Sequence, residues 1–335
     1  MSPRRLLLVS PTFHGYWRSI EAAFRALGYD ASTYCYDAAP KAEKLWNKVR
    51  HELPARVRGQ QGHLSPDLVS ARAAHAVREA RPDIVLVVRG DVLTPAFWGE
   101  VREVGAVPAM WLYDEIRRMR YDINTIGDLG AIATYSSVDA AALNAKGVQA
   151  LHVPLAFDPA VVPSPMAPMG EFNFIGARYG RREEYLQAMV AAGIPVRAHG
   201  RDWSSHPVDR ARTFRLEAPP VPAGRDLALP DAYGVMRAGL GTLNVHGDQD
   251  GFTMRTFEAA GVGAVQLVDR PDVEHYYDPG REVLVFTDPD ELVRQCRNVM
   301  ASADRMAALR EAAAARTRAE HTFVHRARSL EALWQ

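Results

Sequence analysis

Short apolar runs alternate with longer amphipathic segments along the whole chain. The runs have the length and composition of buried strands, and the segments between them space their apolar residues as helices do. This alternation is typical of a parallel α/β architecture. In the first half it predicts strands at 5–10, 83–89, 108–113 and 131–135, with helices such as 16–27 and 66–81.

The same pattern is repeated after a proline-rich segment, FDPAVVPSPMAPMG at 157–170, which predicts an interdomain linker. We therefore expect two Rossmann-like domains, at 1–160 and 171–320, followed by a terminal helical segment at 321–335. Beyond the linker the predicted strands are 172–176, 196–200, 239–246, 264–268 and 282–286, and the predicted helices are 185–192, one from about 253, 290–300, 303–319 and 321–334.

Composition narrows the class of protein. With 335 residues, 47% of them hydrophobic, the chain can form ordinary packed cores. Its 40 basic and 40 acidic residues give no net charge, which disfavours a nucleic-acid partner. Cys35 and Cys296 are too far apart in sequence to suggest a disulfide framework or a thiolate metal site. The apolar run at 6–9 is too short for a signal peptide, so we expect a cytoplasmic protein without a membrane span.

Several well-known motifs are missing from the sequence. The glycine pairs at 239–241 and 261–263 lack the third glycine of the dinucleotide fingerprint, which disfavours a nicotinamide or flavin enzyme. There is no P-loop, no GxSxG elbow and no HExxH. His321 and His325 are four residues apart, but no third ligand accompanies them, so we expect packing or surface roles and no metal site.

The most informative segment is VHGDQDGFTMRTFEAAGVGAV, residues 245–265. It contains a DxD pair, Asp248 and Asp250, but the same spacing recurs at Asp288 and Asp290, so the motif alone carries little weight. Its position matters more, because this loop leaves an apolar strand and enters a helix. Open α/β sheets bind their ligands at such places.

The residues of this loop suit a nucleoside diphosphate. Gly251 permits a close backbone approach, and Thr253 is a candidate N-cap. The amides of the first helical turn form an anion site, to which Arg255 adds a positive charge. The carboxylate of Glu258 matches the two donors of a ribose diol. Spacing alone leaves open the alternative of an amphipathic helix with a surface glutamate.

Four phrases of the second half carry a resemblance to a known family: FNFIGARYGRREEYL, VRAHGRDW, MRTFEAAGVGAVQLVDRPDVEHYYDPGREVLVFTDPDEL and EHTFVHR. In their order and spacing, residues 172–335 resemble the C-terminal domain of CgeB-type glycosyltransferases, named after a spore maturation protein and related to the retaining GT-B transferases. The first half resembles the family only in its α/β layout and in an acidic pair after a strand, Asp114 and Glu115.

The resemblance implies roles for individual residues. GT-B relatives have two acidic residues eight positions apart, which match Asp250 near the donor sugar and Glu258 on the ribose. An arginine six residues after the glycine of the FIG strand, here Arg182, is expected to meet the diphosphate, with Arg178 nearby. Trp203 is either part of the base pocket or a core residue. The expected nucleotide-sugar-binding residues are Glu258, Asp250, Gly251, Phe252, Thr253, Arg255, Arg182 and Arg178.

Two residues of the first half are candidate catalytic groups. His14 follows the first strand, and Asp114 follows the strand that ends in WLYD. The carboxyl ends of parallel strands are where catalytic groups gather. A loop position without a role in catalysis for His14, and a helix-capping role for Asp114, are the alternatives.

These observations predict an α/β protein of the GT-B fold, in which two Rossmann-like domains face a cleft and the C-terminal helix crosses back to the N-terminal domain. The expected activity is that of a hexosyltransferase using a nucleoside-diphosphate sugar, UDP-sugar being favoured, with retention and with no metal or other cofactor. The alternatives are a non-catalytic sugar-nucleotide-binding or assembly protein and a GT-B-fold sugar-nucleotide epimerase. The acceptor and the oligomeric state are left open, and a nucleic-acid acceptor is disfavoured.

Overall fold

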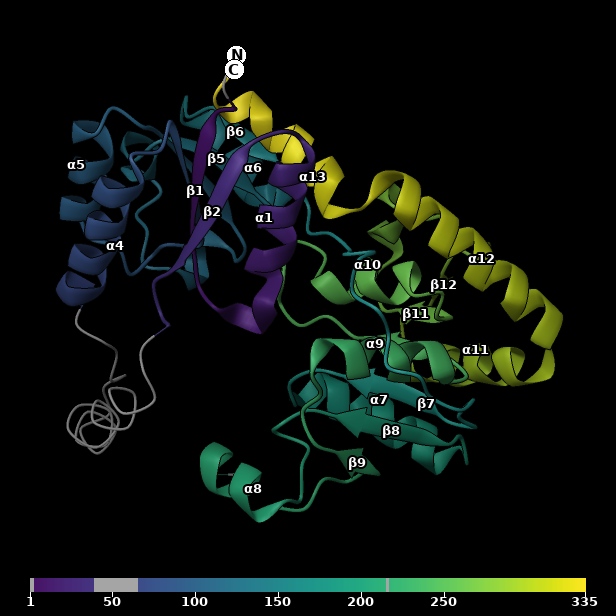
Figure 1. Ribbon diagram of the computed structural model, residues 1–335. Coiled ribbons are helices and arrows are strands. Elements are labelled where there is room, and N and C mark those ends of the chain that lie inside the picture. The colour runs from purple at the N-terminus through teal and green to yellow at the C-terminus, as the bar shows by residue number, and fades with distance from the viewer. Residues whose placement is uncertain (1–2, 39–65, 215–216) are drawn as a thin grey trace. The chain divides into compact units, whose positions relative to one another are not determined.

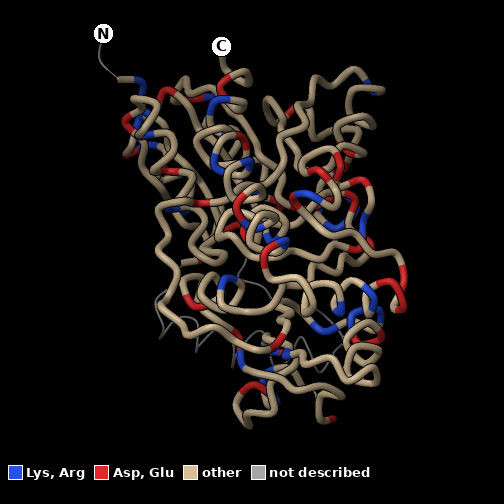
Figure 2. Tube along the Cα trace, turned by 90° about the vertical axis from the view of Figure 1, so that its right-hand side faces the viewer, with Lys and Arg blue, Asp and Glu red and all other residues tan. Residues whose placement is uncertain are grey.

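The computed structural model describes residues 3–38, 66–214 and 217–335 and divides into two compact units (Figure 1). The first unit contains Met1–Pro154 together with Phe323–Gln335, and the second contains Leu155–Thr322. Each unit is built on its own six-stranded sheet. Figure 2 shows acidic and basic positions interspersed along the trace. No helix in the described ranges is both long enough and apolar enough to cross a bilayer.

The first unit contains a wholly parallel sheet in the order β2-β1-β3-β4-β5-β6. Parallel strands covered on both faces are apolar without alternation, and all five residues of β3 are buried. The strands are β1 (Arg5–Ser10), β2 (Asp30–Cys35), β3 (Ile84–Val88), β4 (Val107–Leu112), β5 (Ala131–Thr134) and β6 (Ala150–His152).

Helices cover this sheet on both sides (Figure 1). On one side Val77 and Trp98 share a core with Val85 of β3. On the other side α1 and α13 pack together through the rings of Tyr16 and Phe323, whose centroids are 6.4 Å apart. The helices of this unit are α1 (Tyr16–Ala26), α4 (Pro66–Ala80), α5 (Pro95–Glu103), α6 (Ser137–Ala145) and α13 (Phe323–Leu330), with short 3-10 turns at Phe13–Gly15, Ile116–Arg118, Ile126–Asp128 and Glu331–Leu333.

The second unit has a parallel sheet in the order β12-β11-β10-β7-β8-β9. Its strands are β7 (Phe172–Ile175), β8 (Val196–His199), β9 (Ala223–Gly224), β10 (Thr242–Asn244), β11 (Gln266–Val268) and β12 (Leu284–Val285). Its helices are α7 (Gly180–Ala191), α8 (Pro207–Thr213), α9 (Leu229–Ala238), α10 (Met254–Gly261), α11 (Pro289–Ala301) and α12 (Ala303–Glu320), with a 3-10 turn at Pro271–His275.

The prediction of a parallel α/β architecture is confirmed in both units. The predicted strand at 5–10 has the observed limits of β1. The strands that the pattern did not predict are β2, β6 and β9, which are short or partly exposed. All three are also edge strands, so none of them needs a continuous apolar run.

The proline-rich segment at 157–170 differs from the expected linker, because it packs within the second unit. The Ser164 amide donates to the Pro230 carbonyl at 2.9 Å, and the Met169 amide donates to the Ala238 carbonyl at 2.7 Å. The Phe157 and Tyr233 rings lie 5.7 Å apart. The segment is thus held to α9 and, through the Phe157 amide, to the His321 carbonyl at 2.9 Å. The change of unit lies earlier, after Pro154.

Candidate functional site

The carboxyl edge of the second sheet gathers polar residues from several strands. Because the strands are parallel, the residues that follow β7, β8, β10 and β11 all emerge at this edge. They include Gly176, His246 and Asp269. This is the edge at which open α/β sheets bind ligands.

The loop from β10 to α10, residues 245–253, is held by an arginine that follows β11. Arg270 donates to the carbonyls of Gln249, Asp250 and Gly251 at 3.0, 2.9 and 3.3 Å. Its guanidinium also lies 4.2 Å from the centre of the Phe252 ring and pairs with Asp272. A planar fork of donors suits several carbonyls at once. Arg270 therefore fixes the backbone on which Asp250 is carried.

His246, the first polar residue of this loop, is paired with Asp269. Its Nδ1 lies 2.8 Å from Oδ1 of Asp269, and its amide donates to both carboxylate oxygens at 3.0 and 3.1 Å. Only 1% of His246 is exposed, and burial lowers the pKa of the imidazole. The other ring nitrogen, Nε2, is buried and has no hydrogen-bond partner.

Glu258 lies on the buried face of α10 and is fully excluded from solvent. Its Oε2 pairs with Nη1 of Arg255 at 2.5 Å, one turn earlier on the same helix. The alternative of a surface glutamate is therefore wrong. Arg255, which was expected to add positive charge for the diphosphate, also pairs with this carboxylate, because the three-residue spacing brings the two side chains together.

Thr253 occupies the N-cap position of α10, as the sequence predicted, but its side chain does not cap the helix. Its backbone is extended, with φ −70° and ψ 164°, and its carbonyl accepts the Thr256 amide at 3.0 Å. The hydroxyl oxygen is buried without a hydrogen-bond partner. A buried hydroxyl in this condition is costly unless a ligand or water completes it.

Arg182, on α7, reaches the same edge. Its Nε donates to the Val245 carbonyl at 2.8 Å and its Nη1 to the Ala177 carbonyl at 2.9 Å. Only 8% of the residue is exposed, and this burial lowers the pKa of the guanidinium. The arginine therefore joins the ends of β7 and β10, in addition to any contact with an anion.

Arg178 and Trp203 form a neighbouring group. Arg178 makes a bidentate pair with Glu183, at 2.6 and 3.1 Å, and its guanidinium lies 5.6 Å from the Trp203 ring. Trp203 is fully buried in the core of the unit and donates to the Gly176 carbonyl at 3.0 Å. Of the two alternatives for Trp203, the structure supports the core residue.

In the first unit, the strand ends carry two strained residues. His14 follows β1 in an exposed 3-10 turn, at φ 45°. Arg89 follows β3 at φ 63°, and its carbonyl accepts the Tyr121 hydroxyl at 2.8 Å. Left-handed backbone at non-glycine residues costs free energy and is concentrated at functional sites.

Asp114 follows β4 at the same edge, between two arginines. Its carboxylate oxygens lie 3.7 Å from Nη1 of Arg89 and 3.8 Å from Nη1 of Arg118. Burial, assisted by the neighbouring Glu115, raises its pKa to about 6. Asp114 does not cap the following 3-10 turn, because the Ile116 amide donates instead to Asp139 at 2.9 Å.

Glu115 is fully buried behind Asp114. Its Oε1 accepts the Tyr135 hydroxyl at 2.5 Å, and its Oε2 lies 3.2 Å from Nε of Arg118. Two adjacent carboxylates thus share one arginine. The two carboxylates differ in exposure, because Glu115 is fully buried and the Asp114 side chain is 26% exposed.

The remaining residues considered in the sequence analysis, His321, Cys35 and Cys296, lie in packed surroundings. His321 is buried against Phe257, with ring centroids 5.3 Å apart, and its Nε2 lies 3.3 Å from the Tyr276 carbonyl. Burial raises the pKa of Cys35 to about 11 and that of Cys296 to about 12. Within the described ranges, no three histidine, cysteine or acidic side chains come together as a metal site.

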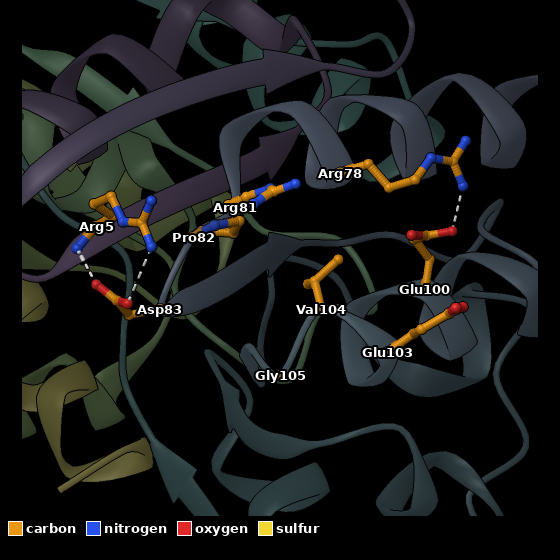
Figure 3. A pocket seen from close by; sticks show the side chains of 9 residues that line it. All are labelled: Arg5, Arg78, Arg81, Pro82, Asp83, Glu100, Glu103, Val104 and Gly105. Atoms are coloured by element: carbon orange, nitrogen blue, oxygen red, sulfur yellow. Dashed lines mark hydrogen bonds and ion pairs between the residues drawn. The ribbon is translucent and has the colours of Figure 1, made fainter.

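A surface pocket of about 550 Å³ lies at the opposite, amino edge of the first sheet (Figure 3). Arg5 there pairs with Asp83, and Arg78 pairs with Glu100. These charges satisfy one another, and the pocket is on the wrong side of the sheet for strand-end chemistry. We therefore do not assign the site to it.

Sequence reasoning missed His246, Asp269 and Arg270. The available signal was their position, because His246 ends one predicted apolar strand, and Asp269 and Arg270 follow another. Their pairing joins residues 23 positions apart and depends on β10 lying beside β11. Spacing along one segment could not reveal it.

Residues 181–332 match the family model described as glycosyl transferase-like. This segment contains α10, Glu258 and Arg270, and thus most of the second unit's candidate site. No curated protein matches the sequence.

Solved structures show the fold of the whole chain. HepE from Anabaena in complex with UDP-glucose has a TM-score of 0.66 at 11% identity, over 98% of both chains. Sucrose-phosphate synthase from Thermosynechococcus elongatus has a TM-score of 0.63 at 14% identity, over 99% of this chain and 98% of that one. A Listeria monocytogenes protein described as a UDP-N-acetylglucosamine 2-epimerase has a TM-score of 0.57 at 12% identity, over 98% and 95%. The predicted GT-B fold is confirmed.

Proposed function

We propose that this protein is a glycosyltransferase of the CgeB type that transfers a hexosyl group from a UDP-sugar to an acceptor hydroxyl. The observation that carries the proposal is the buried Glu258 on α10, at the carboxyl edge of a parallel sheet and within the glycosyl transferase-like segment. A carboxylate fixed by Arg255 is suited to accept the two hydroxyls of a ribose. The UDP-glucose complex of HepE supports uridine as the base.

The diphosphate is proposed to bind between the start of α10 and Arg182. The Thr253 hydroxyl and the first amides of α10 supply donors, and Arg182 and Arg255 supply positive charge. When the bond from the sugar C1 to the diphosphate oxygen breaks, the electron pair stays with the leaving UDP. These groups then stabilise the developing charge without a metal ion.

The acceptor side is proposed to use Asp114 and His14. Asp114 accepts the hydrogen bond of the acceptor hydroxyl, which orients its oxygen toward C1. In the retaining reaction implied by the resemblance, the hydroxyl proton passes to an oxygen of the diphosphate as the new C1–O bond forms. A strong protein base is then not required, and the role of Asp114, between two arginines, is to position the acceptor.

The decisive experiment is a thermal-shift and calorimetric screen with UDP, GDP, dTDP and ADP, followed by product analysis with the UDP-sugar that binds. A ligand at one hundred times its dissociation constant stabilises the native state by about 2.7 kcal/mol. Stabilisation by UDP and transfer with retained anomeric configuration, read by NMR, are expected. Absence of binding by all four nucleotides would contradict the proposal, and binding without turnover would favour a non-catalytic sugar-nucleotide-binding protein.

The structural likeness to a described 2-epimerase supports one other candidate activity. Epimerisation needs acid and base groups around the sugar, and Asp114 and Glu115 are adjacent carboxylates with different surroundings. Incubation with UDP-N-acetylglucosamine and no acceptor distinguishes the two activities. An epimerase changes the configuration of the bound sugar, whereas a transferase releases UDP only when an acceptor or water takes the sugar.

A further inference from the structure

Several hydrogen bonds between His246 and Asp269 fix the orientation of the imidazole ring. Asp269 is 4% exposed, and its carboxylate contacts Nδ1 of His246, the His246 amide and Nη2 of Arg181, the last at 3.3 Å. These contacts leave the imidazole little freedom to rotate. The ring is also bordered by Phe252, whose centroid lies 5.2 Å away in an edge-on arrangement.

The surroundings of the ring decide which nitrogen carries its proton. A carboxylate accepts hydrogen bonds, so Nδ1 donates to Asp269 and Nε2 keeps its lone pair. Burial favours the neutral imidazole, and Arg270 and Arg182 oppose a second proton, whereas Asp269 alone favours one. The balance lowers the pKa, so Nε2 is an acceptor near neutral pH.

This acceptor has no partner among the described residues, although 99% of the histidine is buried. The next two residues, Gly247 and Asp248, are exposed, so the loop that also carries Asp250 reaches the surface one residue after His246. We infer that Nε2 of His246 accepts a hydrogen bond from a hydroxyl group of the donor's sugar, which makes His246 a specificity-determining residue. The inference rests on the proposed function and adds to it.

The chemistry of the acceptor selects among the parts of a sugar nucleotide. Diphosphate oxygens are unprotonated near neutral pH and cannot donate to a lone pair, so the diphosphate is excluded as the partner. The ribose is assigned to Glu258, on α10. The sugar hydroxyls and the N3–H of uracil remain as donors. The loop that begins at His246 contains Asp250, the residue proposed to lie at the sugar, which favours the sugar hydroxyls.

Two substitutions separate contact with the sugar from structural support. In His246→Asn, the side-chain amide can replace Nδ1 and preserve the bond to Asp269, but nothing replaces Nε2. In His246→Gln, the longer side chain can place an amide oxygen near the position of Nε2. We expect His246→Asn to weaken binding of UDP-glucose roughly tenfold relative to binding of UDP. His246→Gln should keep the ratio of UDP-glucose affinity to UDP affinity close to that of the wild type. A purely structural role predicts the opposite order.

The measurement is calorimetry with UDP and UDP-glucose on each variant of the full chain, with His321→Asn as the matched loss of a buried histidine in the same unit. UDP-glucose analogues that lack single hydroxyls identify the partner: one of them loses affinity in the wild type and loses none further in His246→Asn. An unchanged ratio of UDP-glucose to UDP affinity in folded His246→Asn overturns the inference. An equal loss for both ligands also overturns it, because the partner then belongs to the nucleotide.

Failure of the proposed function has a different result. Wild-type protein that binds neither UDP nor UDP-glucose would contradict the assignment of the whole site. A wild type that binds both, together with an unaffected His246→Asn, would contradict only the role of His246.

Discussion

Replacing Glu258 removes the proposed ribose anchor and one member of a buried ion pair at the same time. Glu258→Gln keeps the volume and one oxygen acceptor, whereas Glu258→Ala removes both. In either variant Arg255 loses its charged partner, which lay 2.5 Å away. The effects on binding and on stability must therefore be measured separately.

The structure sets the size of both effects. A hydrogen bond to a charged group contributes about 1.5 to 3 kcal/mol, so Glu258→Ala should raise the dissociation constant of UDP by roughly 10- to 150-fold. Breaking a fully buried ion pair costs about 3 to 5 kcal/mol. The Arg255 side chain is 25% exposed and can regain part of its hydration, so we expect a smaller loss of about 1 to 3 kcal/mol.

Isothermal calorimetry with UDP gives the first quantity and denaturant unfolding gives the second. Glu282→Gln is a matched control, since Glu282 is also a buried glutamate of the second unit and pairs with Arg316 at 3.3 Å. It should lose stability without losing affinity for UDP. If folded Glu258→Gln and Glu258→Ala bind UDP as the wild type does, the ribose assignment is refuted.

Three further predictions concern acid–base behaviour, metals and the loop. The raised pKa of Asp114 means that the folded state binds the carboxyl proton more tightly than the unfolded chain does, so the free energy of unfolding should fall as pH rises from about 4 to 6. Activity should rise through about pH 6, because the ionised carboxylate accepts the hydrogen bond of the acceptor hydroxyl. Asp114→Asn should lose both pH dependences, and an unaltered pH profile in this variant would exclude the proposed role of Asp114. Transfer should persist in EDTA, and loss of activity restored by Mn²⁺ would instead make Asp248 and Asp250 metal ligands. Arg270→Lys keeps the charge but not the planar fork, so hydrogen exchange of the amides at 247–253 should accelerate at least several-fold, and unchanged protection would contradict the bracing role.

The architecture could be predicted because its signals are local. Buried parallel strands are continuous apolar runs, so β1, β3, β4 and β5 were identified to within one or two residues. β2, by contrast, is an edge strand with residues Asp30 and Ser32, and it depends on pairing with β1. The composition of the proline-rich segment predicts a linker, because composition does not reveal its hydrogen bonds to α9, which are made by two backbone amides and by the Ser164 hydroxyl.

The candidate site was only partly predictable. The resemblance to GT-B relatives singled out Asp250 and Glu258 by their eight-residue spacing, and the place of Thr253 followed from the start of the helix. Packing decides whether an arginine hydrogen-bonds a ligand or other groups of the protein, and the sequence does not show packing. The sequence therefore did not predict that Arg182 donates to the carbonyls of Val245 and Ala177. The pair of His246 and Asp269 needed the adjacency of β10 and β11, which no single segment encodes.

The division of the chain bears on how the protein is made. The first unit is discontinuous, because Phe323–Gln335 completes it after the whole of the second unit has been synthesised. Until those residues leave the ribosome, Tyr16 and Phe24 of α1 lack Phe323 and Trp334, with which they pack in the finished fold. The half that emerges first is thus the one completed last. A premature stop near the end of the message should leave the second unit able to fold during translation, and the first unit with an exposed aromatic surface for chaperones to bind.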